Sequence, residues 1–189
     1  MVNRSTFRYD YFVIWANGLR HEEEILAILR GEEKLELMEI RRVPIPDMRE
    51  FILELYAHDS VPMKHLEEKI RYLFKEKPEA LIVLARHFEP DEYSFENDWG
   101  KFTRSMYIHL LKERVRNGFN PRIEEKRTME NVIHASDHEL QVDHILKMLG
   151  HPEGIEYLYS RYGKADYHDG LSLANYAPQY RPEYKRDSS

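Results

Sequence analysis

The sequence predicts an α+β fold of the ferredoxin-like type, in which a four-stranded antiparallel sheet is covered by helices on one face. Three observations predict it. Four short apolar runs alternate with segments whose apolar residues recur every three or four positions, which is the order of strands and helical crossovers. Gly, Pro and Asn-Gly signals separate these segments. The length of 189 residues suits one domain with its own core.

The chain opens with a predicted strand and helix. Residues 11–15, with the sequence YFVIW, are β-branched and aromatic and stop at the turn signal Asn17-Gly18, so they predict a buried strand. Residues 21–30 place apolar side chains on one stripe and three glutamates in the first turn, where the helix dipole favours acids. Gly31 follows, and the predicted helix ends there.

A second strand and two short helices are predicted next. Within residues 34–43, apolar and acidic residues alternate until Met38, where the alternation changes phase. Residues 48–56 and 63–74 predict helices. The second of them begins directly after Pro62, and proline is tolerated at a helix entrance because the missing N–H costs little there.

The second half of the chain repeats the order strand, helix, strand, helix. Residues 79–86 are almost entirely apolar and predict a central strand. The helical period of residues 102–117 predicts a helix that Gly118 ends. Residues 130–134 predict the fourth strand, and residues 137–149 predict the last helix of the sheet domain.

The C-terminal part of the chain differs in character. We expect residues 8–150 to form the domain, and residues 151–189 to form a short helix at 155–162 and an extended tail rich in Tyr and Pro. The tyrosines predict that the tail packs on its own domain or on a neighbouring subunit, because a solvated tail would carry few aromatic residues.

The composition argues against several classes of function. A net charge of −6 and a pI near 5.9 argue against a broad nucleic-acid-binding surface, since phosphate backbones attract basic proteins. The lack of cysteine excludes disulfides, thiolate catalysis and cysteine-based zinc sites. The first residues show no signal-peptide pattern, and the longest apolar run, residues 80–85, is too short to span a bilayer. We therefore expect a cytoplasmic protein without a membrane or nucleic-acid partner.

A histidine at the end of the fourth predicted strand is the main candidate functional residue. His134 follows an apolar run and precedes Ser136 and Glu139, which fit a capping box for the last helix. A helix N-terminus favours an anion, because its amides and its dipole point toward it. A neutral imidazole beside it is therefore placed to attack a phosphorus atom, provided that a partner holds one tautomer.

Two other interpretations of this histidine stay open. A histidine at a strand end can simply hydrogen-bond to the backbone. His134, His138 and His144, with Asp137 and Asp143, also suggest a metal site. However, His138 and His144 are six residues apart, so on a helix they point about 120° apart, which disfavours a metal cluster.

Cations are concentrated just upstream, between Lys112 and Arg122. Lysine and arginine in a last helical turn complement the helix dipole, and this alone explains them. Near a phosphate-accepting histidine they also match what triphosphate recognition requires, because arginine forks bind phosphate oxygens in pairs.

These residues carry a resemblance to a known family. The segment around the histidine, Asn131-Val132-Ile133-His134-Ala135-Ser136-Asp137, is similar to the active-site signature N-[VI]-I-H-G-S-D of nucleoside diphosphate kinases, with Ala in place of Gly. Upstream, the segment Arg114-Val115-Arg116-Asn117-Gly118 and the turn Asn120-Pro121 resemble the family's Arg-Val-x-x-Gly segment and Thr-Asn-Pro turn. The resemblance covers residues 11–149.

The resemblance implies a ferredoxin-like sandwich and ping-pong transfer of a γ-phosphate through a phosphohistidine at His134. Ser136 would help to hold the site, and Asp143 would replace the family's histidine-orienting glutamate. Mg²⁺ would arrive on the phosphates of a nucleoside di- or triphosphate, and a homo-oligomer is expected. The implied nucleotide-binding residues are Asn131, Arg114, Arg122, Arg116, Tyr56 and Asn120.

The chain also departs from the family's pattern. The family's first strand ends in Lys-Pro-Asp-Gly, whose lysine binds phosphate, whereas this chain has Trp15-Ala16-Asn17-Gly18. The loop at residues 122–129 is shorter than the family's. Three functions therefore stay open: a phosphotransferase, a catalytically weak or inactive nucleotide-sensing or assembly module, and a nucleotide hydrolase or phosphotransferase with a different acceptor.

Overall fold

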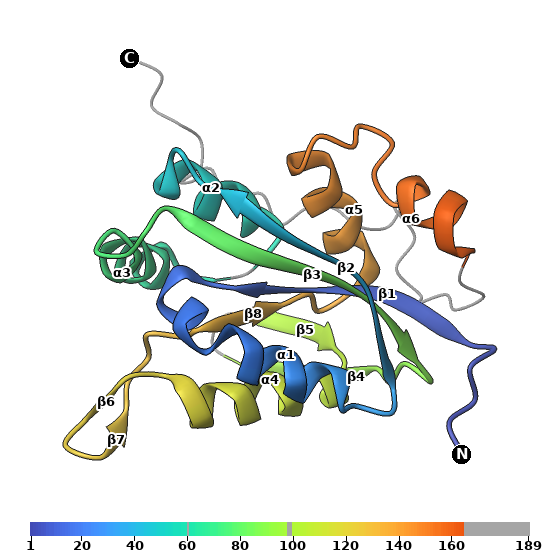
Figure 1. Ribbon diagram of the computed structural model, residues 1–189, viewed down its shortest axis with the longest axis horizontal. Helices are drawn as coiled ribbons and strands as arrows, with labels where there is room; N and C mark the ends of the chain where they lie inside the picture. Colours follow the sequence, from blue (N-terminus) through green and yellow to red (C-terminus); the bar gives the residue numbers. More distant parts are fainter. Residues whose placement is uncertain (60, 98–99, 165–189) are drawn as a thin grey trace.

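The computed structural model of the protein describes residues 1–59, 61–97 and 100–164 (Figure 1). The predicted tail at residues 165–189 lies outside them. Four strands form the main sheet in the order β2-β3-β1-β8, and each neighbouring pair is antiparallel. This order and the intervening helical crossovers are those of a ferredoxin-like sandwich, which confirms the predicted fold class. The strands are β1 (Phe7–Ile14), β2 (Leu35–Pro44), β3 (Glu79–Phe88) and β8 (Ile133–Ala135).

Helices cover both faces of this sheet, so the prediction of a single covered face was wrong (Figure 1). One face packs against α1 (Glu22–Arg30) and α4 (Met106–Phe119). The other face packs against α2 (Met48–Leu55), α3 (Met63–Leu73), α5 (Glu139–Met148) and α6 (Glu156–Tyr162). The physical reason is visible in β1, where Tyr11 and Val13 enter one core and Phe12 and Ile14 the other. A strand that is apolar on both sides must be buried on both sides.

The predicted strands overlap β1, β2, β3 and β8, although β8 begins at Ile133 rather than at residue 130 as predicted. The register of β2 against β3 shifts between Leu37 and Glu39, which confirms the change of phase expected at Met38 and makes it a β-bulge. After β1 the Asn17-Gly18 signal lies inside a 3-10 helix, η1 (Ala16–His21). A Cβ on Gly18 would lie 2.9 Å from Cβ of Val132, so a glycine lets η1 approach the segment that leads into β8.

Two hairpins were not predicted. Strands β4 (Tyr93–Asn97) and β5 (Gly100–Arg104) pair with each other. Residues 102–104, which were predicted to begin a helix, therefore belong to a strand. Helix α4 starts after Ser105, whose side chain caps it by accepting a hydrogen bond from the amide of Ile108 at 3.1 Å. Downstream of α4, β6 (Arg122–Ile123) and β7 (Lys126–Arg127) form a second small hairpin.

The predicted capping box was also wrong. Helix α5 begins at Glu139 rather than at residue 137, and the side chain of Ser136 does not cap it. Ser136 Oγ instead accepts a hydrogen bond from the amide of Tyr11 at 2.9 Å and donates to Asp10 at 2.7 Å. Glu139 accepts from the amide of Tyr9 at 3.1 Å. Because β8 ends at Ala135, it offers no carbonyl partner to the amides of Tyr9 and Tyr11 in β1, and the side chains of Glu139 and Ser136 accept their hydrogen bonds instead.

Helix α6 belongs to the same core. Its Leu158 is fully buried, and Tyr9 Oη donates to the carbonyl of Gly163 at 2.5 Å just beyond the helix. Among the helices in the described ranges, none is both long enough and apolar enough to cross a membrane.

A buried polar network joins β1, β3 and the end of β8. Asp10 and Arg8 are almost fully buried, and Arg8 donates to both oxygens of Asp10 at 2.9 and 3.1 Å. His87 and Ser136 also hydrogen-bond to this carboxylate, at 3.0 and 2.7 Å. Burial by itself raises the pKa of Asp10, but the charge of Arg8 and the bond to His87 outweigh it and lower the pKa to about 2.

Replacing Asp10 with Asn should lower the free energy of unfolding by about 3–5 kcal/mol at pH 7, because Arg8 would stay buried without its carboxylate. The stabilisation is present above the ordinary pKa near 3.8 and is lost as the pH falls toward about 2. Urea denaturation at neutral and acid pH measures both effects, and the two proteins should converge in acid.

Asp47→Asn is the matched control. Asp47 caps α2 by accepting from the amide of Glu50 at 2.8 Å, and asparagine caps equally well, so the change should stay within about 0.5 kcal/mol. An equally small change for Asp10→Asn would show that the network does not stabilise the fold.

Candidate functional site

The histidine that the sequence singled out lies in the middle of the edge strand β8. His134 pairs with Val13 of β1, and it is 6% exposed. The rings of Tyr11 and Tyr56 flank it, with centroids 5.8 and 4.7 Å from that of the imidazole. Its Nε2 lies 3.3 Å from Tyr11 Oη and 3.9 Å from Oδ2 of Asp59. Its Nδ1 makes no hydrogen bond with a residue in the described ranges.

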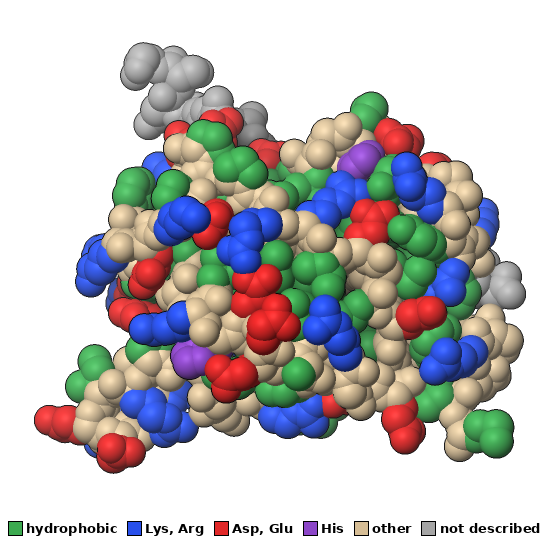
Figure 2. All heavy atoms as spheres, in the orientation of Figure 1, with side chains coloured by type: hydrophobic (Ala, Val, Ile, Leu, Met, Phe, Trp, Pro, Cys, Tyr) green, Lys and Arg blue, Asp and Glu red, His purple; other side chains and the backbone are tan. Residues whose placement is uncertain are grey.

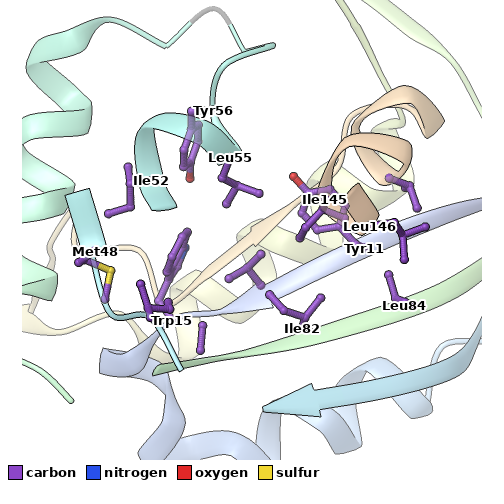
Figure 3. Packing of buried hydrophobic residues seen from close by; sticks show 14 of the residues in the cluster. Tyr11, Trp15, Met48, Ile52, Leu55, Tyr56, Ile82, Leu84, Ile145 and Leu146 are labelled. Atoms are coloured by element: carbon purple, nitrogen blue, oxygen red, sulfur yellow. The ribbon is translucent and has the colours of Figure 1, made fainter. Parts of the chain in front are cut away.

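Two of these neighbours come from the end of α2. Tyr56 is the C-cap residue of α2 and belongs to the core around Trp15 and Leu55 (Figure 3). Asp59 follows in the connection to α3, where its amide donates to the carbonyl of Tyr56 at 3.0 Å. Its Oδ1 accepts a hydrogen bond from Gln141 of α5. The packing of α2 beside α5 therefore brings a buried carboxyl group to the histidine.

Cationic side chains approach the imidazole from two helices. Arg116 of α4 donates from Nε and Nη2 to the carbonyl of Ile133, at 3.2 and 3.1 Å, and so binds the backbone of β8. Lys69 of α3 donates to Tyr72 Oη at 2.7 Å, and its Nζ lies 4.6 Å from the ring centroid of Trp15. Both charges disfavour a protonated His134.

Lys112 of α4 is the third cation and differs from the other two. It is 7% exposed, yet its ammonium makes no hydrogen bond or ion pair within the part of the chain that the structure describes. Asp137 and Asp59 favour its charge from a distance, whereas Arg116 opposes it. An ammonium group that is removed from water costs stability unless an anion compensates it.

The burial of this site changes the protonation of its members. Burial, and then Lys112, Lys69 and Arg116, hold the pKa of His134 well below its ordinary value, so the ring is neutral near pH 7. Burial also lowers the pKa of Lys69 and Lys112. Burial, followed by the charge of Asp137, raises the pKa of Asp59 to about 8, although Lys112 opposes this shift. A bound anion would favour the charged forms of both lysines.

Sequence reasoning did not assign Lys69 to the site, and it named Lys112 only as the start of the cationic segment, but a signal was present for both. Both lie on the apolar stripe of their helices, where a charged residue is unexpected. The buried residues of α3 are Leu66, Lys69, Ile70 and Leu73, and those of α4 are Ile108, Leu111, Lys112 and Val115. No comparable signal marked Asp59, which lies in a connection between helices.

The structure brings some of the predicted site residues together. Tyr56 and Arg116 lie around His134 as described above. Asn120 and Asn131 bind each other, with Nδ2 of Asn120 donating to Oδ1 of Asn131 at 2.9 Å. Asn120 also accepts from the amide of Val132 at 3.1 Å. This pair therefore braces the entrance to β8.

Other predicted residues are bound elsewhere. Arg114 pairs with Glu32, and Arg122 donates to the backbone of its own hairpin and of the end of α4. Ser136 binds Asp10 and Tyr11, as described above. Asp143 accepts from the amide of Ile155 at 2.8 Å and from Lys147 at 2.7 Å, which ties α5 to the start of α6.

The charged residues around the site are not arranged for a metal ion. Within the described ranges, no three His, Asp or Glu side chains gather to hold one. The face seen in Figure 2 carries acidic and basic side chains interspersed with one another. The two lysines that act on His134, Lys69 and Lys112, are buried rather than part of such a surface.

Comparisons with known proteins add the following findings. The sequence matches no protein-family model and no curated protein. The structure is similar to the nucleoside-diphosphate kinase of Borrelia burgdorferi, a transition-state mimic with bound vanadate and ADP, at 12% identity and a TM-score of 0.44 over 76% of this chain and 86% of that chain. It is also similar to the apo nucleoside diphosphate kinase of Encephalitozoon cuniculi, at 17% identity and a TM-score of 0.44 over 83% of this chain and 90% of that chain.

Proposed function

We propose that the protein is a nucleotide-binding phosphotransferase in which His134 accepts the γ-phosphoryl group of a nucleoside triphosphate and passes it to a diphosphate. The observation that carries this proposal is a neutral histidine within electrostatic reach of Lys112, a lysine that is 7% exposed and makes no hydrogen bond or ion pair in the described residues. A site that combines a neutral nucleophile with positive charge that no ion pair neutralises suits an incoming phosphate.

The chemistry requires one free ring nitrogen. With the proton on Nε2, the lone pair of Nδ1 attacks the γ-phosphorus, the Nδ1–P bond forms and the bond to the bridging oxygen breaks. The nucleoside diphosphate leaves with that electron pair, and the ring becomes a cation. Lys112, Lys69 and Arg116 would stabilise the negative charge on the phosphoryl oxygens. Mg²⁺ would be held by the nucleotide phosphates rather than by a protein cluster.

Lys69 supports this proposal from an unexpected position. The resemblance places the phosphate-binding lysine of nucleoside diphosphate kinases where this chain has Trp15. The ammonium of Lys69 lies over that tryptophan ring, 4.6 Å from its centroid. Lys69 of α3 thus places a cation close to Trp15, the position at which the family has its phosphate-binding lysine. The expected homo-oligomer remains a prediction of the resemblance alone.

A nucleotide-sensing or assembly module is the second candidate, and a specific observation favours it. Arg114, Arg122 and Asn120, which the resemblance assigns to the nucleotide, all take part in contacts within the protein. A site that keeps its cations but lacks these nucleotide contacts would bind phosphate groups without transferring them efficiently.

Labelling with γ-³²P-ATP and Mg²⁺ tests the main proposal. The wild-type protein should acquire an acid-labile, alkali-stable label that GDP removes as labelled GTP. His134→Ala should remove the label completely, because the nucleophile is gone. His144→Ala is the matched control and should label normally, since His144 Nε2 hydrogen-bonds to the carbonyl of Glu54 at 2.7 Å and its ring contacts His58 rather than His134.

Two other results would decide against the proposal. No label in the wild-type protein, with ATP binding detected by calorimetry, would favour the sensing module. A label that appears but that water removes, without transfer to GDP, would instead indicate hydrolysis.

Replacing Lys112 with Met should raise the free energy of unfolding by about 1–3 kcal/mol, because it removes a buried charge without breaking a contact. Wild-type protein should gain thermal stability from inorganic phosphate, and the variant should gain much less. Thermal unfolding with and without phosphate measures both effects.

Lys64→Met is the control on exposed α3 surface and should change stability by no more than about 0.5 kcal/mol. A Lys112→Met protein that is destabilised, or that phosphate still protects fully, would remove Lys112 from the phosphate site.

A further inference from the structure

We propose that Asp59 is the positioning residue that keeps the proton of His134 on Nε2 and thereby leaves the lone pair of Nδ1 free to attack the phosphoryl group. This inference rests on the proposed function of the site. It assigns the role to the connection between α2 and α3, whereas the resemblance assigns it to Asp143 on α5.

The geometry leaves one oxygen of Asp59 for this role. Its Oδ1 is taken by the side-chain amide of Gln141, whose own Oε1 accepts from the amide of Asp137 at 2.6 Å. Oδ2 faces the imidazole, 3.9 Å from Nε2 of His134. This distance is longer than a hydrogen bond, so a small approach of the two groups would form one.

A carboxylate is needed because the other neighbour of Nε2 does not determine the tautomer. Tyr11 Oη lies 3.3 Å from Nε2 and can donate or accept a hydrogen bond. If Tyr11 donates, the ring proton moves to Nδ1 and blocks the attacking lone pair. An ionised Asp59 can only accept, so it selects the tautomer in which Nδ1 is free.

The same carboxylate favours the product. Attack through Nδ1 leaves the ring with a positive charge and a proton on Nε2. A carboxylate beside Nε2 stabilises that charge, in the way that a buried aspartate stabilises the imidazolium of a catalytic triad. Asp143 cannot replace it without losing its bonds to Ile155 and Lys147.

The role predicts a pH dependence. The pKa of Asp59 is raised to about 8, so the carboxyl is mostly protonated at neutral pH and ionises as the pH rises through that value. The charged or titratable groups that face it are His134, Asp137 and Lys112, with Tyr11 and Tyr56 beside the ring, and Lys69 and Arg116 around it. His134 is already neutral in this range, and burial keeps the pKa of both tyrosines well above 10.0.

The experiment follows the tautomer of His134 directly. Long-range ¹H–¹⁵N spectra of the full-length protein between pH 6 and 9.5 distinguish a protonated Nε2 from a protonated Nδ1. The wild-type protein should shift toward the Nε2–H tautomer with a midpoint near pH 8. Asp59→Asn should abolish this transition, and it should fold, because asparagine resembles the protonated form. Asp143→Asn should leave it unchanged.

Initial rates of γ-³²P labelling provide the second readout. The wild-type rate should rise roughly tenfold from pH 7 to pH 9, and the Asp59→Asn rate should stay low and nearly flat. A wild-type profile in Asp59→Asn, or a loss of the transition in Asp143→Asn alone, would overturn the role of Asp59.

The two proposals can fail separately. If the tautomer depends on Asp59 but no protein takes up label, the positioning role holds and phosphotransfer fails. If wild type and Asp59→Asn label with the same pH profile, phosphotransfer holds and the positioning role fails.

Discussion

The short strand β8 depends on side chains for hydrogen bonds that a longer strand would supply, and the candidate site depends on β8. Where β8 ends, Ser136 and Glu139 accept hydrogen bonds from amides of β1. Arg116 donates to the carbonyl of Ile133. Because unpaired backbone groups inside a protein are costly, these side-chain hydrogen bonds help to hold β8, and with it His134, in place.

Charge burial is the second constraint on this part of the molecule. Asp10 and Arg8 lie buried as a pair with further hydrogen bonds, which is how a folded protein ordinarily accommodates charge. Lys112 is also buried, although at 7% exposed it is less deeply buried than Arg8 at 1%, and it has no such pair in the described residues. The Asp10–Arg8 network therefore stabilises the fold, whereas Lys112 reduces its stability and suits an anion. For this reason Asp10→Asn is expected to lower the free energy of unfolding and Lys112→Met to raise it.

The candidate site shows where sequence reasoning succeeds and where it stops. His134 and Tyr56 were predicted and lie together. Arg114 and Arg116 were both proposed for nucleotide binding, and only the direction of each side chain on α4 decides which one reaches β8. Asp143 was proposed as the carboxylate near the histidine, but the turn before α6 takes it. Asp59 could not have been found, because its distance from His134 depends on how α2 packs beside α5.

By itself, the sequence determined the order of the four sheet strands and of the main helices, the bulge in β2 and the strand that carries His134, because each follows from local periodicity and turn residues. The tertiary structure decided that both faces of the sheet are covered, where α5 begins and which charged residues surround the histidine. Lys69 and Lys112 come from helices far apart in the sequence. Local sequence patterns cannot predict that these lysines lie near His134, since the packing of distant helices sets the direction of each side chain and the energetic cost of burying it.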